Sequence, residues 1–159
     1  DYEEDPKRVI SQLLELSTRH PESNFLLIHM GQVEFSGAKL MLEKTKNIHF
    51  MTSHADNETQ NKILNKDTNV KFQTGWINLF DKDNNIQKKW INLMNENPLR
   101  FVVALDNVWD FQWLEGYAER VLMWRKALAS LNKDTAGLIA CGNSNEYFKL
   151  GIECLSERK

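Results

Sequence analysis

Residues 25–31, which read FLLIHMG, carry the main indication of the fold. This is a continuous apolar run of strand length that a glycine closes, a pattern typical of a strand buried on both faces of a parallel sheet. Similar runs follow at residues 48–52 and 100–105, and we expect shorter strands at residues 70–73 and 136–140. The sequence therefore predicts five strands.

Apolar residues at helical spacing lie between these strands. Asp5-Pro6 has the character of an N-cap followed by proline at the first helical position, and a later helix must end before Pro98. We expect helices at residues 6–20, 32–46, 56–65, 86–97, 113–131 and from 145 onward. Strands that alternate with helices predict an α/β fold, namely a three-layer α/β/α sandwich of Rossmann or RecA-like type around a mostly parallel five-stranded sheet.

The composition is that of one ordinary domain. The chain has 159 residues, of which 42% are hydrophobic and 26% charged, and its formal net charge of −2 gives no reason to expect nucleic acid or a membrane as a partner. We find no linker or repeat, so residues 1–159 are expected to form a single domain. Because the first residue is Asp1, we expect this domain to be excised from a longer multidomain protein.

The expected compartment is the cytoplasm. No apolar run approaches the length of about 18 residues that spans a membrane, and the acidic N-terminus is unlike the basic start of a signal peptide. Cys141 and Cys154 lie in an expected strand and in the tail helix, which fits reduced thiols of an intracellular core.

Polar and aromatic residues follow the expected strands. In a parallel sheet the carboxyl ends meet at one edge, where ligands bind. The candidate ligand-binding residues at these ends are His29, His54, Trp76, Asp106, Trp109 and Asn143. Trp76 and Trp109 would form an apolar wall. The alternative is that the polar residues only cap helices and close turns, as they do in most α/β proteins.

Specific catalytic signatures are missing. The chain contains no GxxxxGK[ST] phosphate loop, no GxGxxG fingerprint and no GxSxG nucleophile elbow. His29 and His54 could converge with Asp56 or Asp106 into a site of two histidines and one carboxylate, but single histidines more often complete a core or a loop. We predict no catalytic residues, no resident metal and no cofactor.

The second half of the chain resembles a known family. Residues 106 and 109 give an acidic-Trp segment after a strand, residues 117–120 read YAER on a helix, and residues 138–141 read LIAC. This order is similar to the closing third of the MEDS (DcmR-like) sensory domains of methanogens and methylotrophs, and residues 25–30 fit the same order of elements. The resemblance implies a non-catalytic, RecA-like sensor of small organic compounds that lacks a Walker motif and is attached to a DNA-binding or histidine-kinase output.

Three functions remain open. The leading hypothesis is a sensory or regulatory domain that binds a small organic ligand at the carboxyl edge of the sheet, within a signal-transduction or transcription-regulation protein. It would act on an output domain of the same chain or on a protein partner, and it could form a homodimer. The alternatives are an interaction or scaffold domain on a degenerate enzyme fold, and a metal-dependent hydrolase or nuclease that uses His29, His54, Asp56 and Asp106.

Overall fold

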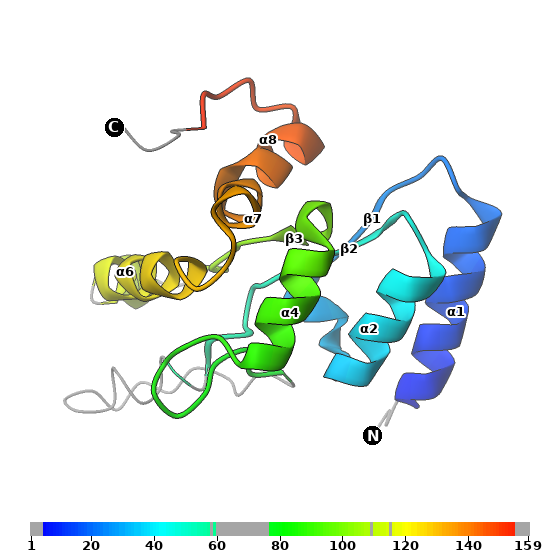
Figure 1. The fold of residues 1–159 in the computed structure, drawn as a ribbon, viewed down its shortest axis with the longest axis horizontal. Coiled ribbons are helices and arrows are strands. Elements are labelled where there is room, and N and C mark those ends of the chain that lie inside the picture. Colours follow the sequence, from blue (N-terminus) through cyan, green and yellow to red (C-terminus); the bar gives the residue numbers. More distant parts are fainter. Residues whose placement is uncertain (1–4, 58, 60–76, 109, 115, 155–159) are drawn as a thin grey trace.

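Three short parallel strands form the centre of the molecule (Figure 1). The computed structural model describes residues 5–57, 59, 77–108, 110–114 and 116–154. Within these residues the sheet has the order β1-β2-β3, with β1 (Phe25–Leu27), β2 (Ile48–Met51) and β3 (Phe101–Val102). Each strand therefore ends at the same edge of the sheet.

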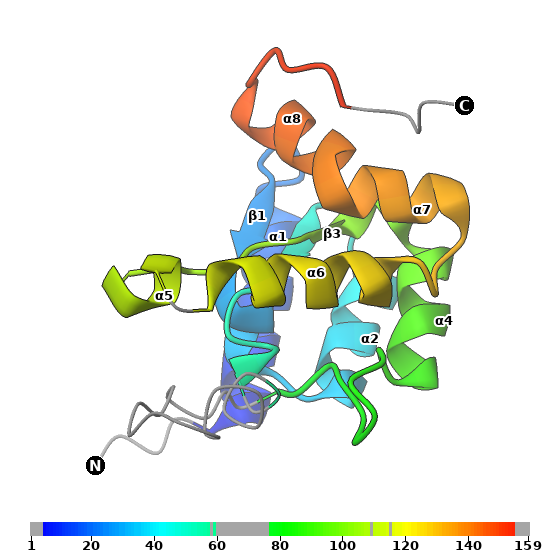
Figure 2. The same ribbon diagram turned by 90° about the vertical axis from the view of Figure 1, so that its left-hand side faces the viewer.

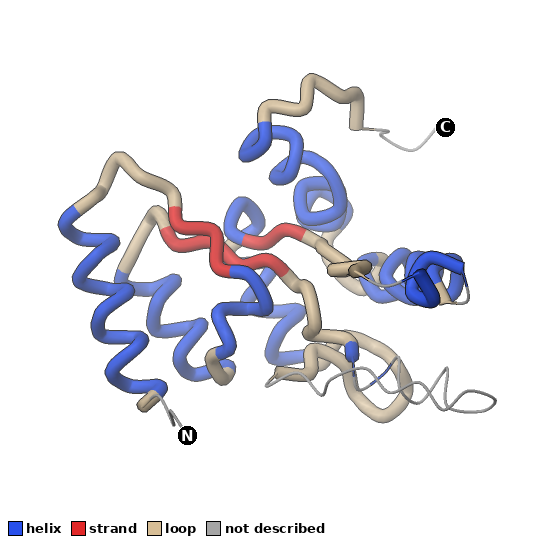
Figure 3. Tube along the Cα trace, turned by 180° about the vertical axis from the view of Figure 1, so that it is seen from behind, coloured by secondary structure: helices blue, strands red, loops and turns tan. Residues whose placement is uncertain are grey.

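Helices lie on both sides of this sheet (Figure 3). On one side are α1 (Pro6–Arg19), α2 (Phe35–Lys44) and α4 (Lys88–Glu96), and on the other are α7 (Lys133–Gly137), the π-helical turn η3 (Leu138–Gly142) and α8 (Asn143–Phe148). The 3-10 turns are η1 (Ile28–Gln32) and η2 (Pro98–Arg100). Figure 2 shows α6 (Tyr117–Leu128) crossing in front of the sheet, with α5 (Asp110–Leu114) before it.

The predicted five-stranded, three-layer sandwich is wrong. The residues that the structure describes are 58% helical and contain a sheet of three strands. The strand expected at residues 136–140 is helical, because a short apolar run fits a buried helix as well as a strand. Ile139 is fully buried there, and its carbonyl oxygen accepts a hydrogen bond of 3.1 Å from the Val103 N–H just beyond β3. The strand expected at residues 70–73 lies outside the described residues.

The first strand ends earlier than its apolar run. After Leu27 the backbone enters the left-handed region at His29, Met30, Gly31 and Gln32, with φ values of 53°, 56°, 64° and 53°. This conformation costs roughly 1–2 kcal/mol for each residue with a side chain. A Cβ at position 31 would also lie 3.0 Å from the Leu27 side chain, so glycine fits both the angle and the space. The following helix consequently begins at Phe35, not at residue 32.

The remaining helices follow the sequence pattern with shifted ends. In α1 the Asp5 carboxylate accepts from the Lys7 N–H at 3.0 Å, which confirms the predicted N-cap. Helix α4 ends before Pro98, as expected. The long helix expected at 113–131 is instead two helices, and the last helix begins at Asn143, two residues early. The helix expected at 56–65 lies mostly outside the described residues.

One observation concerns the expected compartment. Cys141 and Cys154 form a disulfide, so the prediction of reduced thiols is wrong. The bond joins residues 13 positions apart and ties the segment after α8 back to η3, a link that sequence spacing alone did not reveal.

Across the part of the chain that the structure describes, no helix has the length and apolar character needed to cross a membrane.

A buried asparagine joins the first helix to the central strand. The Asn47 side-chain amide donates to the carbonyl oxygens of Ser17, His20 and Ser23 at 3.2, 2.9 and 2.8 Å. Its own side-chain oxygen accepts from the Ser17 hydroxyl. Asn47 is only 7% exposed and Ser17 only 3%, so the bond to the Ser17 carbonyl oxygen lies where little water can replace it. The side chain fixes the turn between α1 and β1 beside the start of β2.

Replacing Asn47 by alanine is expected to lower the free energy of unfolding by about 2–4 kcal/mol, because three carbonyl groups lose their donor in a buried site. Urea unfolding followed by circular dichroism measures the loss. The control is Asn92→Ala on the exposed side of α4, where we expect a change within about 0.5 kcal/mol. Equal effects of the two substitutions would contradict this role of Asn47.

Candidate functional site

The carboxyl ends of the three strands bring His29, His54 and Asp106 together. His29 follows β1, His54 follows β2 and Asp106 follows β3. The His54 Nε2 atom lies 2.6 Å from Asp106 Oδ2, and the His29 Nε2 atom lies 4.0 Å from the same oxygen. The two imidazole rings stack with centroids 4.1 Å apart and planes 17° apart. Three of the six predicted binding residues thus form one cluster.

Each member of this cluster has a strained backbone. The φ angles of His29, His54 and Asp106 are 53°, 62° and 53°, all in the left-handed region that residues with side chains rarely adopt. Strain of this kind persists where the surrounding structure imposes it, and it concentrates at functional sites. The strand ends are therefore shaped to turn these three side chains toward one another.

Ser53 holds the His29 ring. Its hydroxyl oxygen accepts from the His29 backbone N–H at 3.1 Å and lies 3.0 Å from His29 Nδ1. Ser53 itself is buried. While Nδ1 is engaged in this way, the other ring nitrogen of His29 lies on the side of Asp106. Sequence reasoning missed Ser53, although its position next to His54 at the same strand end was a usable signal.

The side chains of the cluster are partly exposed, by 18% for His29, 24% for His54 and 32% for Asp106. Partial burial lowers the pKa of His54, and the neighbouring His29 lowers it further, while the Asp106 carboxylate raises it. The net direction is downward, which favours the neutral imidazole over the charged form. Because all three side chains are partly exposed, a ligand can reach the polar atoms of the cluster.

Two residues after His54, Asp56 takes part in a buried ion pair that holds α6. Arg120 donates to both oxygens of Asp56, at 2.7 Å from Nε and 2.6 Å from the terminal nitrogen, and Trp124 Nε1 donates to Asp56 at 2.8 Å. Arg120 is 2% exposed and the Asp56 side chain is fully buried. A further Arg120 nitrogen donates to Asn107 Oδ1 at 3.0 Å, next to Asp106. Asp56 thus has a structural partner and does not join the cluster, contrary to one predicted alternative.

Of the other three predicted binding residues, the structure describes only Asn143. Trp76 and Trp109 lie outside the described residues, so the predicted aromatic wall is not addressed. Asn143 is buried at the start of α8, where its amide donates to the carbonyl oxygens of Pro98 and Phe101 at 2.8 and 2.7 Å. Its predicted place was wrong because the strand expected before it is helical.

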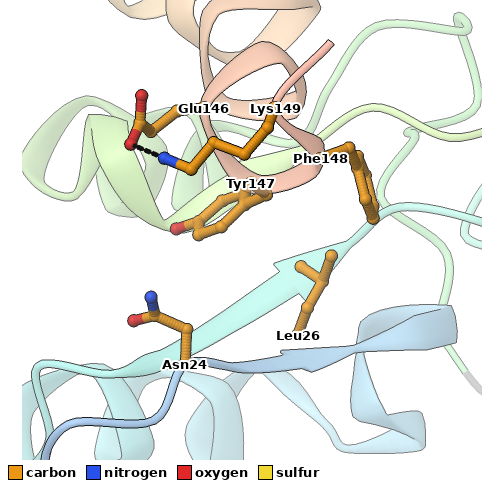
Figure 4. Close-up of a pocket in the computed structure, with 6 residues that line it drawn as sticks. All are labelled: Asn24, Leu26, Glu146, Tyr147, Phe148 and Lys149. Atoms are coloured by element: carbon orange, nitrogen blue, oxygen red, sulfur yellow. Dashed lines mark hydrogen bonds and ion pairs between the residues drawn. The ribbon is translucent and has the colours of Figure 1, made fainter.

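Away from this cluster, a hollow lies between α8 and β1 (Figure 4). Its lining residues are Asn24, Leu26, Glu146, Tyr147, Phe148 and Lys149. Glu146 and Lys149 form an ion pair with each other on the exposed surface, and Tyr147 is engaged with the sheet: its hydroxyl donates to the Leu99 carbonyl oxygen at 2.9 Å and contacts His49 Nδ1. The charged and hydroxyl groups here have partners within the chain. The histidine cluster is the better candidate site.

His49 and Tyr147 are both held in their neutral forms. Burial and the nearby Arg100 guanidinium lower the pKa of His49 to about 4. Burial raises the pKa of Tyr147 to about 12. His49 Nε2 also lies 3.3 Å from the Asn24 side-chain oxygen. The pair therefore connects α8 to β2 without carrying charge near pH 7.

The cluster at the carboxyl edge has the composition of a metal-binding group. Within the residues that the structure describes, His29, His54 and Asp106 are the set of three or more candidate ligands whose donor atoms all lie within 4.8 Å of one another. Two imidazoles and a carboxylate can equally form hydrogen bonds with a polar organic molecule, since together they offer both donors and an acceptor.

Comparisons of the chain with family models, curated proteins and solved structures find no match. The resemblance to MEDS sensory domains therefore stays a prediction.

Replacing Asp56 by alanine is expected to destabilise the protein by about 3–5 kcal/mol, because the buried Arg120 guanidinium then lacks its carboxylate. Thermal and urea unfolding measure the change. Asp83→Ala, at an exposed position in the turn before α4, is the control and should stay within about 0.5 kcal/mol. A small effect at Asp56 would show that α6 is held by other contacts.

Lowering the pH from about 6.5 to about 4 is expected to destabilise the protein through His49. The folded state keeps this ring neutral over that range while the unfolded state takes up a proton, so stability falls with falling pH and the effect levels off below about pH 4. At about 1.4 kcal/mol per pKa unit the contribution is at most about 3 kcal/mol. The titratable groups that face His49 are Arg100 and Tyr147.

The measurement is the free energy of unfolding against pH for the native chain and for His49→Gln, with the exposed His20→Gln as control. The difference between native and His49→Gln proteins should shrink as the pH falls. A pH-independent difference would contradict a neutral, buried His49.

Proposed function

We propose that the domain is a sensory or regulatory module that binds a small ligand at the carboxyl edge of its parallel sheet, through His29, His54 and Asp106. The observation that carries this proposal is the convergence of three polar side chains from three separate strand ends, each on a left-handed backbone. Caps and turns alone do not require such convergence. The partial exposure of all three side chains leaves their polar atoms within reach of a ligand.

The buried pair of Asp56 and Arg120 supports the same proposal. It fixes α6 against the residues that follow β2, and through Asn107 it reaches the residue next to Asp106. A ligand that moves His54 or Asp106 would therefore act on groups in contact with α6. This gives ligand binding a route to a change at the molecular surface, as a sensory role requires.

There are two alternative functions. A metal-dependent hydrolase would use the same cluster, without the Asp56 carboxylate that pairs with Arg120. An interaction domain would use exposed apolar side chains, which lie on α5 and α6 as well as on the terminal helices; those of α5 and α6 are Trp113, Leu114, Tyr117 and Leu122. A cytoplasmic location is part of the sensory proposal, and the disulfide weighs against it.

The proposal predicts that small polar molecules bind at the cluster. The test records amide chemical shifts by NMR in a buffer with EDTA, with acetate, inorganic phosphate, methylamine and methanol as probes of four functional groups. At least one probe should shift the amides of His29, Ser53, His54 and Asp106 selectively, and the response should disappear in Asp106→Ala but persist in Asp83→Ala. If no probe shifts these amides more than the rest of the chain, metal-free ligand binding at this edge is refuted.

A further inference from the structure

We propose that the ligand held at this edge includes one divalent transition-metal ion, of the class of Zn²⁺, bound by His29 Nε2, His54 Nε2 and an Asp106 carboxylate oxygen. This inference rests on the proposed function, because it names the chemistry of the same site. It differs from the expectation of no resident metal, and it takes up the site of two histidines and one carboxylate that the sequence offered as a less favoured possibility. The structure instead shows both rings beside one carboxylate oxygen.

The distances suit a single ion after small side-chain movements. Ligands at about 2.0–2.2 Å from a tetrahedral ion lie about 3.4 Å from one another. The two measured nitrogen-to-oxygen distances, 2.6 Å for His54 and 4.0 Å for His29, lie on either side of that value. The ion takes the place of the direct contact between His54 Nε2 and Asp106 Oδ2, and the stacked rings tilt so that both Nε2 lone pairs point at it.

The surroundings of His29 prepare it to bind a metal. A histidine ligand usually donates its second ring N–H to a neighbouring oxygen, which fixes the tautomer and the ring direction. Ser53 Oγ, at 3.0 Å from His29 Nδ1, is placed to accept that hydrogen bond, which leaves the Nε2 lone pair for the ion. Ser53 is buried and is itself fixed by the His29 backbone N–H. Ser53 is therefore a positioning residue of the site.

The set of ligands selects the class of metal. Ca²⁺ and Mg²⁺ prefer oxygen ligands, whereas two imidazole nitrogens and one carboxylate suit Zn²⁺, Co²⁺, Ni²⁺ or Fe²⁺. Asp56, the nearest further carboxylate in the sequence, has both oxygens bound by Arg120 and does not add a fourth ligand. Three protein ligands at a partly exposed edge leave positions on the ion for water or for an organic ligand.

The test titrates the chain, free of any affinity tag and with its disulfide intact, with Co²⁺ followed by visible absorption and with Zn²⁺ followed by calorimetry. We expect one ion per chain and d–d bands typical of a site with nitrogen and oxygen ligands. Binding should be lost in His29→Ala, His54→Ala and Asp106→Asn, and weakened about 10–100-fold in Ser53→Ala. The exposed His20→Ala is the matched control and should bind as the native chain does.

Circular dichroism spectra and melting curves establish that each variant is folded, and Asp106→Asn is the variant closest in shape to the native side chain. The inference is overturned if the native chain binds neither ion, or if Asp106→Asn and His54→Ala bind both ions unchanged. Binding of an organic probe in EDTA by a chain that binds no metal would retain the proposed function and reject the metal. Failure of both experiments would reject both.

Discussion

Parallel pairing of three strands is the constraint on which the rest of the structure depends. Phe25 pairs with Ile48 and Phe50 with Phe101, so the three parallel strands all end at the same edge of the sheet. At that edge the backbone turns through the left-handed region in each case. The candidate site is thus a product of strand direction, and residues far apart in the sequence meet because their strands run the same way.

The two edges of the sheet are held differently. At the amino edge, Arg100 donates to the carbonyl oxygens of Ile48 and Thr45 at 2.5 and 3.0 Å, and Asn47 holds the turn after α1. These contacts satisfy backbone groups and leave little to bind a ligand. At the carboxyl edge, Asp56 and Arg120 form a buried ion pair. The side chains of the histidine cluster at the same edge are partly exposed. The candidate site therefore lies at the edge of the sheet where polar side chains stay partly exposed.

The positions of the three strands were predictable from the sequence, but their ends and the size of the sheet were not. Apolar runs located β1, β2 and β3, and reading the residues after them identified His29, His54 and Asp106. The run at residues 136–140 was misassigned because five apolar residues do not distinguish a strand from a buried helix. The pairing of Asp56 with Arg120, across 64 residues, and the disulfide depend on tertiary contacts that no local pattern encodes.

A metal site at the carboxyl edge is tested most directly by a crystal structure of the chain grown with Co²⁺, examined by anomalous scattering at the cobalt absorption edge. Such a site predicts one strong anomalous peak at coordination distance from His29 Nε2, His54 Nε2 and the Asp106 carboxylate, at the carboxyl edge of the three strands. A map with no peak there, or with the three side chains pointing away from one another, would contradict it.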